Sequence, residues 1–125
     1  MKVYFDNAAT TPLAPEVRDE MTRVMDAHFG NPSSVHAFGR ASRALVEVAR
    51  KKIAGLLHAT PAEIFFTSGG TEADNMAVRG CVEDLGIHRI ITSPIEHYAV
   101  LYSINALAEQ GKVKVEHVAL KEKGH

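Results

Sequence analysis

Hydrophobic residues recur along the chain at spacings that predict helices in four segments and strands in three others. In the helical segments, apolar side chains repeat every three or four residues, which is the period of an amphipathic helix. These segments are 15–28, 38–57, 71–85 and 96–110. In the strand segments, a short apolar run or an alternation of apolar and polar residues is typical of an extended chain. These runs are 64–67, 89–92 and 113–118.

Residues that start and stop regular structure divide these segments from one another. Residues 1–5 are expected to form a short strand or an extended arm, and Pro15 suits the first position of a helix. Thr60 and Glu63 have the spacing of a capping box, which predicts one helical turn just before the first strand. Gly86 and Gly111 are expected to end the third and fourth helices.

The order of elements predicts an α/β fold. Two helices come first, and strand, helix, strand, helix and strand follow. Strands separated by helices of this length favour right-handed crossovers and parallel pairing. With 125 residues the chain is at most one domain. Within it, we expect residues 1–60 to form an arm and two helices, and residues 61–125 to form the alternating part.

The connection between the strand at 64–67 and the helix that follows predicts an anion-binding turn. Ser68, Gly69 and Gly70 break the apolar run, and Thr71 is expected to be the N-cap of the helix. Free backbone N–H groups at a helix start attract a phosphate, and glycines let it approach closely. The alternative is that these glycines serve turn geometry alone.

His97 follows the second strand and is expected to lie beside this turn, because the carboxyl ends of parallel strands meet at one edge of a sheet. Its alternative is an ordinary surface histidine at a helix start. The turn has no Lys-Ser/Thr pair of a Walker loop and no Gly-x-Gly-x-x-Gly pattern, which disfavours a nucleoside triphosphatase and weakens a dinucleotide interpretation.

Composition removes several other classes of function. Apolar residues make up 46% and the net charge is −1, without a basic stripe, so we expect a buried core and no nucleic-acid binding. No stretch is apolar enough for a membrane span, and the single cysteine, Cys81, favours a cytoplasmic location. We expect Cys81 to fill a core position and predict no metal site, since the histidines lack ligand spacing.

Four motifs in order resemble the opening of a cysteine desulfurase of the NifS/IscS type, a member of the class-V aminotransferase group that uses pyridoxal 5′-phosphate. The resemblance covers the whole chain. The motifs are Asp6-Asn7-Ala8-Ala9-Thr10-Thr11-Pro12, Gly30-Asn31-Pro32-Ser33-Ser34-x-His36-x-x-Gly39, Phe66-Thr67-Ser68-Gly69-Gly70-Thr71-Glu72-x-x-Asn75 and Thr92-x-x-x-Glu96-His97-x-Ala99-Val100.

The resemblance implies roles for individual residues. Gly70 and Thr71 match positions that hold the cofactor phosphate, and His97 matches the histidine that stacks on the cofactor ring and assists proton transfer. An imidazole has both the flat face and the titration range for this. The resemblance also implies a substrate side. It is formed by Asn7, Ala8, Ala9, Thr10, Asn31 and His36.

The resemblance further implies the N-terminal part of the large domain of a fold type I transferase, like aspartate aminotransferase, with a parallel or mixed sheet flanked by helices. The family converts L-cysteine to alanine and passes the sulfur, as an enzyme persulfide, to iron–sulfur scaffold or thiolation acceptors. Its Schiff-base lysine and nucleophilic cysteine match nothing in residues 1–125, so we expect this chain alone to be inactive.

We expect the partner to be the remainder of the enzyme or a second copy, as in a homodimer. Two alternatives stay open at this point. One is another class-V enzyme, such as a selenocysteine lyase or a transaminase. The other is a non-catalytic binding or regulatory fragment that keeps the phosphate turn.

Overall fold

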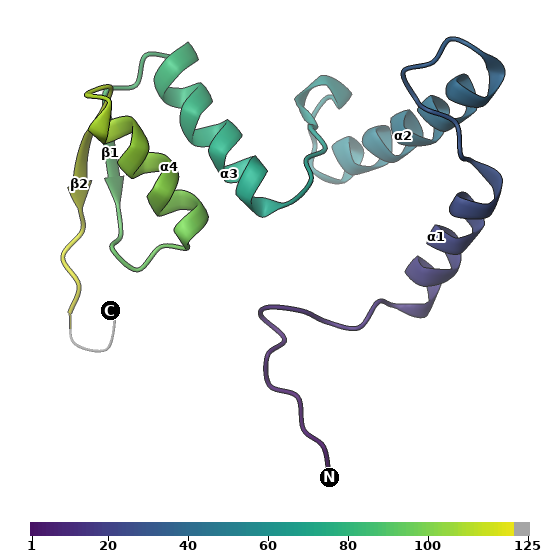
Figure 1. Cartoon of the computed structure of the whole chain (residues 1–125), viewed down its shortest axis with the longest axis horizontal. Helices are drawn as coiled ribbons and strands as arrows, with labels where there is room; N and C mark the ends of the chain where they lie inside the picture. The colour runs from purple at the N-terminus through teal and green to yellow at the C-terminus, as the bar shows by residue number, and fades with distance from the viewer. Residues whose placement is uncertain (122–125) are drawn as a thin grey trace. The chain divides into compact units, whose positions relative to one another are not determined.

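The computed structural model describes residues 1–121, which form two compact units. The first unit is Met1–Ile64 and the second begins at Phe65. Figure 1 shows the elements in chain order, with the helices of the first unit in purple and blue and those of the second in green.

The first unit contains two α-helices and one 3₁₀ turn. Helix α1 is Pro15–Ala27, with its proline at the start, and α2 is Ala37–Leu56. The turn η1, Pro61–Glu63, is held by the predicted capping box, since the Glu63 carboxylate accepts hydrogen bonds from Thr60 N (2.7 Å) and Thr60 Oγ1 (2.7 Å). The N-terminal residues form no strand, so the extended arm is the correct alternative.

The second unit is the α/β part of the chain. Helix α3, Gly70–Arg79, continues as a short π-helical segment η2, Gly80–Asp84. Strand β1 is Arg89–Thr92, helix α4 is Tyr98–Glu109 and strand β2 is Lys114–His117. The two strands pair in parallel, with α4 as the crossover between them (Figure 1). The predicted α/β fold with parallel pairing is therefore confirmed.

The core of the second unit lies between the sheet and its helices. Val82, Leu107 and Val113 form its buried centre, and Leu107 is completely buried. Helix α3 packs along α4, on the same side of the sheet (Figure 1). Gly86 and Gly111 have positive φ angles of 68° and 69°, and each ends the preceding helix as predicted.

Three predictions about this unit are wrong in detail. Residues 64–67 form no strand, and the sheet has two strands where three were expected. No strand among the described residues lies beside 64–67 to complete a hydrogen-bonded ladder. The side chains of Phe65 and Phe66 are 70% and 49% exposed. Cys81 is exposed, although it does lie on the apolar side of its helix, in a groove with Ile87 and Ile91.

Candidate functional site

The glycine turn that was predicted to bind an anion lies at the start of α3, and the helix begins one residue earlier than predicted. Gly69 is the N-cap and Gly70 the first helical residue, so Thr71 occupies the second helical position and is not the cap. The N–H groups of Gly70, Thr71 and Glu72 belong to the first helical turn, which has no preceding carbonyl to receive them. Together they form a positive helix end.

A carboxylate fixes the loop that leads into this helix. The side chain of Glu72 turns back and accepts hydrogen bonds from Ser68 N (2.6 Å) and Ser68 Oγ (2.7 Å). The Ser68 hydroxyl and then its backbone N–H lower the pKa of Glu72, since both stabilise the charged carboxylate. The helix starts at Gly70 because Ala73 N donates to Gly69 O (3.1 Å), and the two Glu72 bonds hold Ser68 against this first turn.

The space in front of the turn is open. A methyl group placed on Gly69 or Gly70 would meet no atom within 4 Å. In the described part of the chain, the Thr71 hydroxyl makes no hydrogen bond of its own. The turn therefore offers backbone N–H groups and one free hydroxyl to a ligand, which is the donor set that a phosphate requires.

His97 is the N-cap residue of α4, as Gly69 is of α3. It is exposed, and it caps the helix, because its Nδ1 accepts a hydrogen bond from Ala99 N (3.1 Å). An accepting Nδ1 carries no proton, so the neutral ring has its proton on Nε2. The helix cap thus fixes the tautomer and leaves Nε2 and the ring available to a ligand.

The two helices that carry these groups run side by side in the same direction, so their N-terminal ends lie at the same end of the unit (Figure 1). One hydrogen bond joins them, from Ser103 Oγ to Asn75 Oδ1 (2.7 Å). Sequence reasoning assigned no role to either residue. The available signal was Asn75, which the third motif contains four residues after Thr71.

The second motif of the sequence folds into a loop held against the start of α2. Asn31 Oδ1 accepts from Ser33 N (2.9 Å), and His36 is the N-cap, its Nδ1 accepting from Gly39 N (3.4 Å). These bonds are local, and they place both side chains in the first unit. Both side chains therefore stabilise the loop and the start of the helix that follows it.

The first motif forms a tight turn in the same unit. Ala9 N and Thr10 N both donate to Asp6 O, at 3.1 and 3.2 Å. Tyr4 closes the turn, because its hydroxyl lies 2.6 Å from Thr10 Oγ1 and donates to Asp6 O at 2.9 Å. Asn7 and Ala8 are exposed at its tip. Sequence reasoning missed Tyr4, for which an aromatic hydroxyl beside a small polar loop was the signal.

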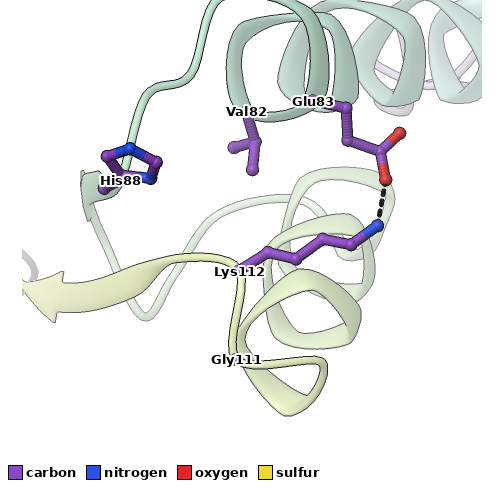
Figure 2. Close-up of a pocket in the computed structure, with 5 residues that line it drawn as sticks. All are labelled: Val82, Glu83, His88, Gly111 and Lys112. Carbon is purple, nitrogen blue, oxygen red and sulfur yellow. Dashed lines mark hydrogen bonds and ion pairs between the residues drawn. The ribbon is translucent and has the colours of Figure 1, made fainter.

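A separate hollow lies at the opposite end of the second unit, where the two strands begin. Figure 2 shows its lining, in which Lys112 Nζ reaches Glu83 Oε1 at 2.5 Å. The ion pair with Lys112, followed by the charge of Arg79, lowers the pKa of Glu83. Ligands of parallel sheets bind where strands end. We therefore do not assign the site to this hollow.

Two features of residues 1–121 bear on the class of site. They contain no group of three His, Cys, Asp or Glu side chains that could hold a metal ion. None of their helices has the length and apolar character needed to cross a membrane.

Comparisons with known proteins point to one family. The profile described as aminotransferase class-V matches residues 3–125. A cysteine desulfurase IscS from Methanosarcina thermophila is 50% identical over 112 residues, which is 87% of this chain and 28% of that protein. The chain thus spans less than a third of the length of this relative.

Solved structures agree with this similarity. A NifS-like protein superposes with a TM-score of 0.86 at 41% identity, over 96% of this chain and 33% of the other. The structure described as SspA in complex with cysteine gives 0.83 at 36% identity, over 94% of this chain and 34% of the other.

Proposed function

The chain belongs to the aminotransferase class-V family, and we propose that it forms the phosphate-binding wall of a pyridoxal-phosphate-dependent cysteine desulfurase. One observation carries the proposal: Gly70 and Thr71 begin one helix, His97 caps another, and both helices start at the same end of the unit. An anion-binding turn and an imidazole at one sheet edge suit a ligand with a phosphate and a flat ring.

The residues present fit the phosphate of this cofactor. The backbone N–H groups of Gly70 and Thr71 would donate to the phosphoryl oxygens, and the Thr71 hydroxyl would add a third donor. No side chain in the described residues covers Gly69 or Gly70, so the phosphate can approach the backbone. The Glu72 carboxylate accepts hydrogen bonds from Ser68, which hold its negative charge on the Ser68 side of the turn.

His97 would contact the ring of the cofactor and take part in proton transfer. Its Nδ1 is held by Ala99 N, so the ring is oriented by the helix and Nε2 is the nitrogen that gives or takes a proton. The bound cofactor would supply an electron sink for the negative charge that develops at the α-carbon of an amino acid substrate. In this proposal His97 would act as a general acid or base through Nε2.

The substrate in this proposal is L-cysteine, which yields alanine and sulfur bound to the enzyme. The name of the Methanosarcina relative and the cysteine bound to SspA support this choice. Residues 1–125 contain no lysine in a Ser-His-Lys context, and Cys81 does not match the nucleophile of the family. The covalent steps therefore need residues other than those of this chain.

The remaining assignments belong to the same proposal and rest on the resemblance. The turn formed by residues 7–10, together with Asn31 and His36, would face the substrate. The chain would act in the cytoplasm with the rest of the enzyme or a second copy, and it would pass sulfur to a scaffold or acceptor protein.

The experiment uses pyridoxine 5′-phosphate, because it has the phosphate and ring of the cofactor but no aldehyde to react with surface lysines. Calorimetric titration of the 125-residue chain should show binding that inorganic phosphate competes away and that pyridoxine does not reproduce. Thr71→Val should weaken the binding about tenfold or more, since it removes a hydrogen bond to a charged group.

Thr22→Val is the matched control, because Thr22 is an exposed helical threonine of α1 in the other unit. It should leave the binding unchanged. The proposal is wrong if the chain does not bind pyridoxine 5′-phosphate, or if Thr71→Val and Thr22→Val bind it equally well.

A further inference from the structure

Asn75 and Ser103 connect the two helices that begin at the candidate site. The side chain of Asn75 donates from Nδ2 to Thr71 O (2.8 Å) and accepts at Oδ1 from Ser103 Oγ (2.7 Å). Asn75 is half-buried and Ser103 is only 3% exposed. The first turn of α3 is thereby linked, through one amide, to the interior face of α4.

The chemistry of the partners fixes the orientation of this amide. A backbone carbonyl only accepts hydrogen bonds, so the group of Asn75 that faces Thr71 O must be the NH₂. The oxygen of Asn75 therefore faces Ser103, whose hydroxyl can donate to it. A buried hydroxyl without a partner is costly, and Asn75 is the hydrogen-bond partner of Ser103 in the described residues.

The hydrogen bond between Asn75 and Ser103, called the bridge below, lies only one or two helical turns from both candidate ligand groups. These groups are Thr71 and His97. Thr71 precedes Asn75 by four residues and His97 precedes Ser103 by six. At about 1.5 Å per helical residue, the two helix starts lie about 6 and 9 Å from the bridge. Because α3 and α4 run in the same direction, both distances extend toward the same end of the unit (Figure 1).

We propose that Asn75 and Ser103 are positioning residues that hold the phosphate-binding turn and the His97 ring at a fixed separation. This inference rests on the proposed function. A slide of α4 along α3 would move His97 relative to Thr71, and the bridge opposes that slide because it joins the helices at one point. The bond to Thr71 O also ties this amide to the first turn of α3.

The test measures pyridoxine 5′-phosphate binding to the 125-residue chain, with far-UV circular dichroism to show that each variant is folded. Asn75→Ala should weaken binding about tenfold, since both hydrogen bonds are lost. Ser103→Ala changes little volume and should weaken it several-fold, and Ser103→Thr, which keeps the hydroxyl, should restore it. Asn105→Ala is the matched control, an exposed asparagine on the same helix.

Two further readouts separate positioning from stability. In a double-mutant cycle, His97→Ala should cost less binding in the Asn75→Ala background than in the wild type, with a coupling of at least about twofold. The ligand should also shift the NMR resonances of the His97 ring in the wild type, and the shift should be smaller in Asn75→Ala.

The outcomes test the proposed function and the positioning role of Asn75 and Ser103 separately. If the wild type does not bind pyridoxine 5′-phosphate, the proposed function and this inference both fall. If the wild type binds it, but Asn75→Ala and Ser103→Ala bind like Asn105→Ala and show no coupling to His97, the inference alone is overturned. Weakened binding with coupling and rescue by Ser103→Thr supports it.

Discussion

Replacing Gly39 by alanine should destabilise the first unit, because the backbone of the loop before α2 lies directly against this residue. A methyl group on Gly39 would lie 2.4 Å from Ser34 O and 2.6 Å from Asn31 O. The approach is mutual, since a methyl on Gly30 would lie 2.4 Å from Phe38 O. Both glycines of the second motif are therefore sites of close backbone packing.

The magnitude follows from two opposing effects. Alanine in place of glycine inside a helix gains about 1 kcal/mol from propensity. To relieve the contacts, however, the loop must move by about 1 Å, which disturbs the His36 cap on Gly39 N and the bond from Arg43 Nε to Pro32 O. Overpacking costs about 1–3 kcal/mol and a lost cap about 1 kcal/mol. The net expectation is a loss of about 1–3 kcal/mol.

Gly55→Ala supplies a matched control on the same helix. A methyl at Gly55 would meet no atom within 4 Å, so only the propensity gain remains, and this variant should be more stable by about 0.5–1 kcal/mol. The two identical substitutions in α2 should therefore act in opposite directions.

Far-UV circular dichroism during thermal or urea unfolding is the assay, since the chain contains no tryptophan. A change of 1 kcal/mol shifts the melting temperature of a 60–100-residue domain by about 4–8 °C. Gly39→Ala should melt lower than the wild type and Gly55→Ala higher. If Gly39→Ala melts at or above the wild-type temperature, the packing of the loop against α2 is not as described.

Two further predictions concern the second unit. Leu107→Ala should lower the free energy of unfolding by about 2–5 kcal/mol in urea titrations, because Leu107 is completely buried between Val82 and Val113, whereas the exposed Leu85→Ala should change it little. The lowered pKa of Glu72 means that its bond to Ser68 contributes stability in full above the ordinary carboxyl pKa of 4.5, and that this contribution disappears as the pH falls through the lower folded value. Glu72→Gln should therefore be less stable than the wild type at pH 7 and differ less from it at pH 3, and an equal difference at both pH values would contradict this assignment.

Local chemistry allowed most of the elements to be predicted from the sequence. The apolar period of α1, α2 and α4, the capping box at Thr60 and the turn glycines act within a few residues, so their consequences can be read along the chain. The glycine turn before α3 and the place of His97 at the start of α4 follow in the same way, since each depends on residues directly beside a helix start.

Residues far apart in the sequence decided what could not be predicted. A strand needs a neighbour for its backbone, and residues 64–67 have none among the described residues; Cys81 lies on an apolar face that no described segment covers. The hydrogen bond between Asn75 and Ser103 joins residues 28 positions apart, and no local sequence pattern predicts it. The sequence alone therefore determined which segments are helical and approximately where they begin and end. The tertiary structure decided which faces are buried and which side chains meet, because burial and pairing depend on neighbours that only folding brings together.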